Sequence, residues 1–302
     1  MIPSSRVFAD PDVELEFRKS GYVVLPVLDQ SEIGSLQELW DRLAIPVPSD
    51  YFASACGDDP RIRRLAQDGI LEVLAPHVSS LTPDYRPVCG SFAVKRGNSS
   101  NGKVALHQDC TLVDQSIFTA VHMWCPLVDV DEHNGCLWVV AGSHAFFDHI
   151  SSVSGNPNPW DGVVEILCSE CSTPVPLKAG TAIFFNGRTL HWSAENRSDR
   201  TRVAAGFISL PTNSNIRFHM WYPANPNRFE IMELEGQMNV QLGSKETFKR
   251  PYPEDWRPVG FMDYQCQPLT PSQIEPLKVR RPGTVTAALP KRRGWLAQFL
   301  HR

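Results

Sequence analysis

The chain has 302 residues, of which 42% are hydrophobic and 21% charged, a composition typical of a globular protein with a substantial core. Its formal net charge of -4 and sequence pI near 6.1 argue against nucleic acid as a partner. No run of residues is long and apolar enough to span a bilayer, and Met1–Asp10 lacks the apolar core of a signal peptide. We therefore expect a cytoplasmic protein without an integral membrane segment.

Eight cysteines are spread along the chain without the spacing of a disulfide framework, so we expect free, mostly buried thiols. Cys168 and Cys171 form a lone C-x-x-C motif, for which two interpretations exist. The first is a zinc or redox site, but no second cysteine pair accompanies the motif. The second, which we favour, is a polar loop that carries two thiols.

The sequence predicts that residues 1–90 are mainly helical, contain one strand and support the core of the domain. The run Gly21–Pro26 is rich in β-branched residues and bounded by glycine and proline, which favours a strand. Asp29 and Glu32 have the spacing of a capping box and predict a helix start, and Pro46 and Pro48 are expected to stop that helix. The apolar face of this helix would contain Ile33, Leu36, Trp40 and Leu43.

A second helix is expected over Arg61–Val78, after which residues 91–211 change to the pattern of short strands and turns. The apolar contacts of the helix would be Ile62, Leu65, Leu71 and Leu74. Asn134-Gly135 predicts a hairpin turn between two of the strands. Many short strands favour a mainly β fold with flanking helices and a double-stranded β-helix (jelly-roll, cupin-like) core. The predicted strands are Ser91–Lys95, Ile117–Leu127, Cys136–Val140, Val163–Cys168, Thr181–Phe185 and Arg202–Leu210.

Residues 212–302 show a weaker pattern, and we interpret them as a C-terminal extension of the same single domain. The aromatic cluster 218–222 would form a lid or a subunit interface, so that either a monomer or a homodimer is compatible with the sequence. A short helix is expected near Glu230, and residues from about 267 onward are proline-rich and expected to be loosely ordered. Residues 291–302 carry basic and apolar side chains, and packing on the protein itself is favoured over contact with a membrane surface.

His107 and Asp109 form an H-x-D triplet around Gln108, and His191 follows far downstream. Because side chains alternate along a strand, His107 and Asp109 should point the same way, while Gln108 points elsewhere. Two imidazoles and one carboxylate suit ferrous iron and leave coordination positions open. H-x-D alone is weak evidence, since a histidine is more often a structural residue than a metal ligand.

The sequence around these residues resembles the phytanoyl-CoA dioxygenase family. The resemblance covers roughly residues 12–211, and the combination of its stretches is more specific than any one of them. The matching stretches are Phe17–Pro26, Leu106–Asp109, Asn134–Leu137, Ala141–His144 and Gly180–Arg202.

This resemblance implies a double-stranded β-helix dioxygenase with Fe(II), 2-oxoglutarate and O2 as its cofactor and co-substrates. It implies Arg202 as the residue that pairs with the distal carboxylate of 2-oxoglutarate, with Ser193 helping to hold it. Gln108, within the metal triplet, and Trp124, which matches a position that lines the co-substrate pocket, are also expected to contact 2-oxoglutarate. The implied iron ligands are His107, Asp109 and His191.

The expected reaction is oxidation, most simply hydroxylation, of an unactivated C–H bond in a small-molecule metabolite, with release of succinate and CO2. Related halogenases replace the metal-binding carboxylate with a small residue, so the presence of Asp109 disfavours halogenation. Secondary metabolism is the setting that we favour, although the sequence does not identify the substrate. Two alternatives are a cupin-like metalloenzyme that does not use 2-oxoglutarate and a non-catalytic barrel that acts as a binding module.

Five further residues have competing interpretations. Lys95 could attract an anion, but an exposed lysine at a strand end is favoured, and His122 could contact substrate or hydrogen-bond a metal ligand. Ala120, His122 and Trp124 should share one face of their strand, the inward one. His144 and Asn196 are interpreted as turn residues, and Arg200 is a weaker candidate than Arg202 for the carboxylate contact.

Overall fold

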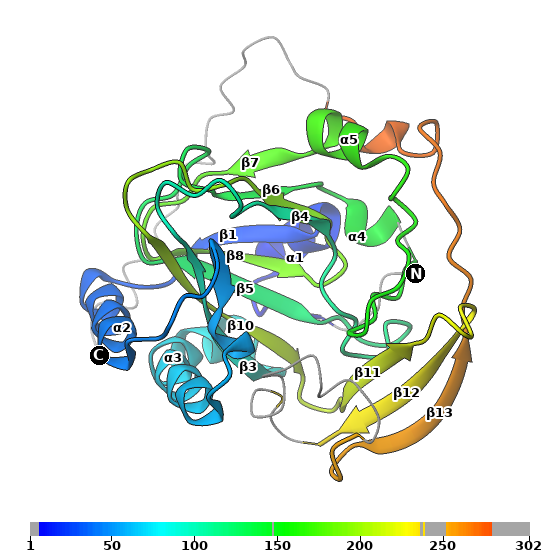
Figure 1. The fold of residues 1–302 in the computed structure, drawn as a ribbon, viewed down its shortest axis with the longest axis horizontal. Helices are drawn as coiled ribbons and strands as arrows, with labels where there is room; N and C mark the ends of the chain where they lie inside the picture. Colours follow the sequence, from blue (N-terminus) through cyan, green and yellow to red (C-terminus); the bar gives the residue numbers. More distant parts are fainter. Residues whose placement is uncertain (1–5, 147, 236–237, 239–251, 280–302) are drawn as a thin grey trace.

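The structure is a computed structural model that describes residues 6–146, 148–235, 238 and 252–279 (Figure 1). Its helical elements are α1 (Pro11–Ser20), α2 (Gln30–Leu43), η1 (Ser54–Cys56), α3 (Pro60–Leu81), α4 (Ser143–Phe146), α5 (Val164–Ile166), η2 (Leu167–Cys171) and η4 (Glu275–Leu277). Its strands are β1 (Tyr22–Pro26), β2 (Tyr51–Ala53), β3 (Tyr85–Lys95), β4 (Val104–His107), β5 (Val121–Pro126), β6 (Leu137–Val139), β7 (Thr173–Val175), β8 (Thr181–Asn186), β9 (His191–Ser193), β10 (Arg202–Pro211), β11 (Ile216–Trp221), β12 (Arg228–Leu234) and β13 (Arg257–Asp263).

The strands form three antiparallel sheets. A six-stranded sheet has the order β1-β8-β5-β10-β3-β2, and a four-stranded sheet has the order β4-β9-β6-β7. These two sheets are the layers of a jelly roll, which confirms the predicted fold class. A third sheet, β11-β12-β13, extends from one side of the jelly roll (Figure 1).

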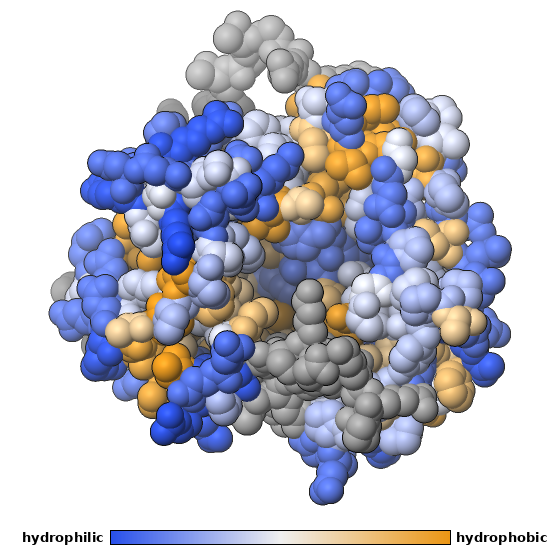
Figure 2. Space-filling view, viewed as in Figure 1, coloured by the Kyte–Doolittle hydropathy of each residue, from blue (hydrophilic) through white to orange (hydrophobic). Residues whose placement is uncertain are grey.

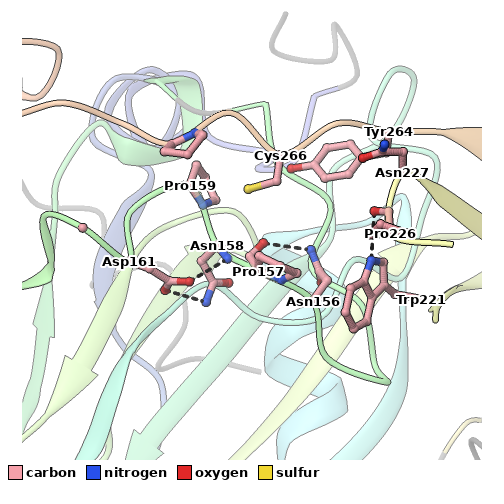
Figure 3. Close-up of a pocket in the computed structure, with 12 residues that line it drawn as sticks. Asn156, Pro157, Asn158, Pro159, Asp161, Trp221, Pro226, Asn227, Tyr264 and Cys266 are labelled. Atoms are coloured by element: carbon pink, nitrogen blue, oxygen red, sulfur yellow. Dashed lines mark hydrogen bonds between the residues drawn. The ribbon is translucent and has the colours of Figure 1, made fainter. Parts of the chain in front are cut away.

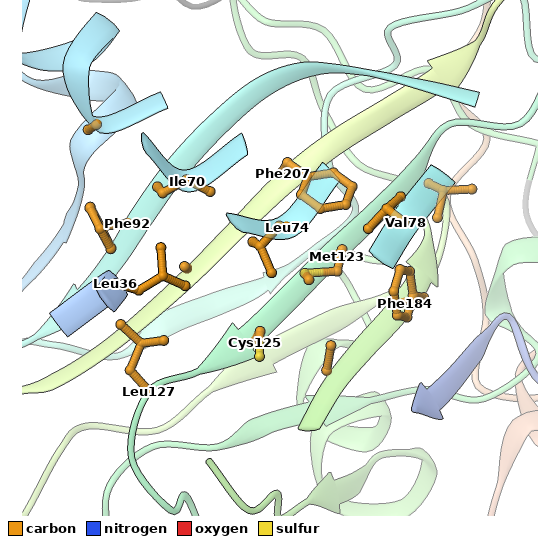
Figure 4. Close-up of a cluster of buried hydrophobic side chains, with 14 of the residues drawn as sticks. Leu36, Ile70, Leu74, Val78, Phe92, Met123, Cys125, Leu127, Phe184 and Phe207 are labelled. Carbon is orange, nitrogen blue, oxygen red and sulfur yellow. The ribbon is translucent and has the colours of Figure 1, made fainter. Parts of the chain in front are cut away.

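Helices α1, α2 and α3 cover the outer face of the six-stranded sheet. The strand Tyr22–Pro26 and the capping box of Asp29 and Glu32 at the start of α2 are confirmed. Helix α2 ends at Leu43, and the residue after it, Ala44, has a left-handed backbone with φ of 45°. Figure 4 shows the resulting core, in which α2 and α3 pack on the sheet through Leu36, Ile70, Leu74, Phe92, Met123, Cys125, Phe184 and Phe207.

The buried face of α3 differs in one respect from the predicted one. Leu74 is fully buried, but Leu65 is 56% exposed, because the helix buries a stripe that runs through Ala66, Ile70 and Val78 instead. We therefore expect Leu74→Ala to lower the free energy of unfolding by about 2–5 kcal/mol, since it leaves a cavity. Leu65→Ala, which removes the same atoms from an exposed site, should change it by less than about 0.5 kcal/mol. Urea denaturation of both variants measures the difference, and equal losses would contradict this packing.

Strand β5 separates the helix-covered core from the interior of the jelly roll. Met123 and Cys125 pack in the outer core, whereas His122 and Trp124 line a cavity on the opposite face. This alternation confirms the expected inward face of the strand.

Two predictions of local structure for residues 163–171 are wrong. Val163–Cys168 was expected to be a strand but forms α5 and the first residues of η2. Val163, Leu167 and Cys171 are all buried, and their spacing of four residues fits a helix rather than a strand. Cys168 and Cys171 are free thiols on this helical segment rather than in a loop.

Asn134-Gly135 does not close a hairpin. Gly135 has φ of +82° and follows a turn in which Asp131 Oδ1 accepts from the main-chain N–H of His133, so a turn is present. However, β5 before it and β6 after it belong to different sheets. The turn therefore connects the two layers instead of two neighbouring strands.

The residues after Pro211 are more regular than predicted. Glu230 lies on strand β12, not on a short helix, because β12 pairs with β11 on one side and β13 on the other. Phe218, His219 and Met220 of β11 are at least 98% buried, so they cannot provide the exposed surface of a lid or a subunit interface. Trp221 and Tyr222 of the same cluster are partly exposed.

The basic segment 291–302 lies outside the described residues, as do 280–290. In the part of the chain that the structure does describe, none of the helices combines the length and apolar character that a bilayer crossing requires.

Candidate metal and co-substrate site

His107, Asp109 and His191 lie together where β4 pairs with β9. His107 ends β4 and is in register with His191, the first residue of β9, so that their ring centroids are 4.2 Å apart. Asp109 lies beyond the end of β4, and its main-chain N–H donates to the carbonyl of Gly187 at 3.1 Å. One ligand atom from each of the three residues lies within 4.8 Å of the others. This donor set of two imidazoles and one carboxylate could hold ferrous iron.

Both histidines present the same ring nitrogen to this centre. Nδ1 of His107 is 2.8 Å from the carbonyl of Ala105, and Nδ1 of His191 is 2.9 Å from that of Thr189. A carbonyl can only accept, so each Nδ1 carries the proton and each Nε2 keeps a free lone pair. Burial lowers the pKa of His191 to about 4, so its ring is neutral at physiological pH and available as a ligand.

Asp109 is surrounded by imidazoles. Its Oδ1 is 3.7 Å from Nε2 of His107, and its Oδ2 is 3.8 Å from Nε2 of His191 and 3.0 Å from Nδ1 of His122. Burial alone would raise the pKa of Asp109, but the neighbouring His122 and His191 hold it well below its usual range. Asp109 is therefore ionised at neutral pH. Of the two interpretations of His122, the structure supports the one in which His122 hydrogen-bonds a candidate metal ligand, the carboxylate of Asp109.

We expect His122 to control the orientation of Asp109. His122→Leu should weaken binding of a divalent metal roughly 10- to 100-fold, as is typical when the hydrogen-bond partner of a ligand is removed. His122→Asn places an amide donor close to the position of Nδ1 and should restore most of the affinity. Competition with a chromogenic chelator measures both variants. Equal affinities of His122→Leu and the unmodified chain would show that Asp109 needs no such support.

Arg202, the first residue of β10, is a buried cation without an acidic partner. It is 2% exposed, and its Nη1 and Nη2 donate to the carbonyls of Ala93 and Gly135 at 3.1 and 3.3 Å. Its Nε has no hydrogen-bond partner, and no carboxylate of the described residues forms an ion pair with it. Burial lowers its pKa to about 10, so it remains charged at neutral pH. A buried charge of this kind fits a carboxylate supplied by a ligand.

The other residues of the predicted site divide into two groups. Ser193 is buried at the end of β9, and the ring of Trp124 lies 5.1 Å from the Arg202 guanidinium, so both are beside Arg202. Gln108 instead points away: its Nε2 donates to the main-chain carbonyl of His149 at 3.0 Å. The predicted contact between Gln108 and the co-substrate is therefore not supported, in agreement with its position between two residues that face the cavity.

A cavity of about 340 Å³ contains the three candidate metal ligands together with Arg202, Ser193 and Trp124. It lies between the two layers of the jelly roll, because its walls come from both sheets. Figure 2 shows that the molecule is hollowed near its centre, with hydrophilic residues at the bottom of the hollow. The remaining wall of the cavity is mainly uncharged and includes Tyr51, Cys56, Cys89, Val104, Leu137, Phe185, Trp192 and Ile208.

The structure also shows the positions of four residues for which the sequence allowed more than one interpretation. Arg200 is on the surface, with 92% of its side chain exposed, which leaves Arg202 as the arginine of the cavity. Asn196 holds a turn as predicted, because its Nδ2 donates to the carbonyl of Arg200 at 2.7 Å. Buried His144 contacts the carbonyl of Arg18 at 3.1 Å, so it joins α4 to α1 in addition to forming a turn. Lys95 is fully buried rather than exposed, which the strand-end pattern did not indicate.

A second cavity of about 420 Å³ lies apart from the candidate metal ligands, between the loop 156–162 and the third sheet (Figure 3). Its polar side chains already have partners: Asn158 Nδ2 donates to the Asp161 carboxylate at 3.1 Å, and the indole of Trp221 donates to the main-chain carbonyl of Pro226 at 3.0 Å. It therefore offers few free groups to a ligand.

Comparison with known proteins assigns the chain to a family. A sequence model of the phytanoyl-CoA dioxygenase (PhyH) family matches residues 52–204, just over half of the chain. The chain belongs to the phytanoyl-CoA dioxygenase family. Among members of the family, phytanoyl-CoA dioxygenase domain-containing protein 1 of Danio rerio is 30% identical over 198 residues, 61% of this chain and 65% of the relative. The Mus musculus protein of that name is 28% identical over 173 residues, 55% of this chain and 57% of the relative. The chain thus spans less than two thirds of the length of these relatives.

Solved structures of other proteins share the fold of this chain. The epimerase SnoN, in complex with Fe3+, alpha ketoglutarate and nogalamycin RO, is 26% identical with a TM-score of 0.50, over 68% of this chain and 87% of SnoN. The carbocyclase SnoK from nogalamycin biosynthesis is 22% identical with a TM-score of 0.51, over 68% and 86% of the two chains. HygX of Streptomyces hygroscopicus, with nickel, 2-oxoglutarate and hygromycin B bound, is 16% identical with a TM-score of 0.51, over 68% and 88%. At such identities SnoK and HygX support the fold alone.

Proposed function

We propose that the protein is an Fe(II)- and 2-oxoglutarate-dependent dioxygenase that hydroxylates an unactivated C–H bond of a small-molecule metabolite and releases succinate and CO2. Membership of the phytanoyl-CoA dioxygenase family supports this reaction class. The complex of SnoN with Fe3+ and alpha ketoglutarate supports the same pair of ligands for a related chain. In this proposal His107, Asp109 and His191 hold the metal.

The observation that carries the proposal is the buried guanidinium of Arg202 in the same cavity as the metal-binding residues. Three metal ligands alone would equally suit a cupin-like enzyme that does not use 2-oxoglutarate. A dicarboxylate that reaches the metal with one end needs a cation for the other end, and Arg202 with the hydroxyl of Ser193 would bind that end.

Bound iron, 2-oxoglutarate and O2 would together supply the oxidant for the C–H bond. The side chains of this protein would orient the reactants. Trp124 would form the wall beside Arg202, and His122 would keep Asp109 in place through its hydrogen bond. The cavity walls would exclude water and determine which carbon of the substrate lies near the metal.

The substrate that we propose is a mainly apolar metabolite from secondary metabolism. The carboxylate and the guanidinium that line the cavity belong to Asp109 and Arg202, which in this proposal bind the metal and the distal carboxylate. The part of the substrate that enters should therefore be uncharged, and Val104, Leu137 and Ile208 provide apolar surface for it. The nogalamycin RO bound in the SnoN complex supports a natural product as the substrate class.

A panel of apolar natural products tests this function through substrate-dependent release of succinate in the presence of Fe(II), 2-oxoglutarate and O2. We expect one succinate for each hydroxylated product and no succinate from Asp109→Ala. Oxidation of a substrate without consumption of 2-oxoglutarate would instead establish the cupin-like alternative.

A further inference from the structure

Gln108 is anchored outside the cavity, although it stands between the two candidate ligands His107 and Asp109. Its Nε2 donates to the main-chain carbonyl of His149 at 3.0 Å, and its own main-chain carbonyl accepts from the hydroxyl of Ser151 at 3.4 Å. Gln108 is buried, and the regular strand β4 already ends at His107. Because Gln108 joins the two ligands, the contacts that fix it also fix the directions in which their side chains point.

The segment that anchors Gln108 is itself attached to the third sheet. Nδ1 of His149 and the hydroxyl of Tyr264, the residue directly after β13, form a hydrogen bond. His149 is 1% exposed, and the ring of Trp160 packs edge-on against it at 5.0 Å between centroids. The main-chain N–H of Tyr264 donates to the carbonyl of Asn227 at 2.9 Å, which holds the tyrosine next to the start of β12. The imidazole is therefore fixed between two aromatic rings.

A second set of contacts joins the third sheet to the chain that follows the metal triplet. The hydroxyl of Ser152 donates to the carbonyl of His219 on β11 at 2.5 Å. Nδ1 of His219 lies 3.0 Å from the carbonyl of Thr111 and therefore donates to it. The main-chain N–H of Arg217, also on β11, donates to the carbonyl of Leu112 at 2.8 Å. Strand β11 thus lies directly against this part of the chain.

These supports come from a part of the chain that lies outside the match to the family model. That match covers residues 52–204, whereas β11, β12 and β13 lie between residues 216 and 263, beside the jelly roll (Figure 1). The contact of Tyr264 with His149 and the contact of His149 with Gln108 lie in series. A change at the tyrosine hydroxyl can therefore reach the metal triplet through one buried histidine.

We propose that His149 and Tyr264 are positioning residues of the metal site. The hydroxyl of Tyr264 fixes the ring of His149, and the main-chain carbonyl of His149 fixes Gln108. Gln108 in turn sets the directions of the two ligands beside it. This inference rests on the proposed function, and it gives the third sheet the role of supporting the metal site. A merely structural role would stabilise the fold and leave the geometry of the bound metal unchanged.

A double-mutant cycle on the binding of Co(II) to the full chain tests this series of contacts. Tyr264→Phe removes only the hydroxyl, and Gln108→Met removes the amide donor from a side chain of similar length. Each variant should bind Co(II) roughly 2- to 10-fold more weakly, as for the loss of one hydrogen bond. The double variant should bind like Gln108→Met alone, because both changes interrupt the same series. The visible absorption bands of bound Co(II) should shift in both single variants, since the ligand directions change.

Tyr252→Phe is the matched control. The hydroxyl of Tyr252 donates to the carboxylate of Glu230 on β12 at 3.2 Å, so this variant also removes a tyrosine hydroxyl bonded to the third sheet. It should leave the Co(II) affinity and the Co(II) spectrum unchanged, even where urea denaturation shows a lower free energy of unfolding. A loss of Co(II) affinity in Tyr252→Phe as large as that in Tyr264→Phe would overturn the proposal.

Two further results would overturn it. One is an unchanged affinity and spectrum in Tyr264→Phe, a comparison that decides the matter even if Gln108→Met does not fold. The other is a double variant in which the two losses of affinity simply add, since independent effects would exclude a common series of contacts. Failure of the unmodified chain to bind Co(II) would instead contradict the proposed function itself, so the two failures are distinguishable.

Discussion

His107→Ala and Asp109→Ala are each expected to abolish turnover and to remove iron from the protein. Each substitution deletes one of the three proposed ligands, and the two remaining donors cannot compete with water and buffer for a labile divalent ion. Metal analysis after gel filtration, together with the succinate assay, measures both losses. Far-UV circular dichroism should be unchanged, because Asp109 lies outside regular structure and His107 is the end residue of β4.

His133→Ala provides the matched control, since His133 is an exposed histidine in the turn before β6. It should retain iron and activity. Retention of stoichiometric iron by Asp109→Ala would show that the metal, if bound, is held by a different set of residues.

Arg202→Ala should raise the concentration of 2-oxoglutarate needed for half-maximal binding by about 30-fold or more, corresponding to roughly 2–5 kcal/mol for truncation of one partner of a buried charge pair. Metal affinity should change little, because Arg202 lies on β10 while the metal-binding residues lie on or next to β4 and β9. Isothermal titration with the metal and then with 2-oxoglutarate separates the two effects.

Arg200→Ala is the control for this second prediction. Arg200 is two residues away in sequence but has 92% of its side chain exposed, so its loss should leave 2-oxoglutarate binding unaltered. An effect of Arg200→Ala as large as that of Arg202→Ala would remove the basis for assigning the carboxylate to the buried guanidinium.

The grouping of the three candidate metal ligands could be predicted because the motif is local and the family pattern supplies the distant partner. His107 and Asp109 are two residues apart, and His191 follows at a spacing typical of the family. The strand expected to carry both His107 and Asp109 nevertheless ends at His107. The side chains of His107 and Asp109 point the same way because, after the end of β4, the carbonyl of Gly187 fixes the main chain of Asp109. The alternation of side chains along a strand does not predict that contact.

Burial of Lys95 could not be predicted from its neighbours in sequence. Its hydrogen-bond acceptors are 98 and 99 residues away, on the far side of the jelly roll, and a lysine at a strand end is usually exposed. Glu230 illustrates the same limitation in the third sheet, because a polar residue among hydrophobic ones fits a short helix as well as a central strand. In both cases tertiary pairing decided the outcome.

The most direct test of the central claim is an anaerobic titration of the Fe(II)-loaded protein with 2-oxoglutarate, followed by visible absorption. If the cavity binds the metal through His107, Asp109 and His191 and the distal carboxylate through Arg202, a visible charge-transfer band of the Fe(II)–2-oxoglutarate chelate should appear and saturate at one equivalent. The band should require much more 2-oxoglutarate in Arg202→Ala. A folded protein that binds Fe(II) and develops no such band would contradict the account.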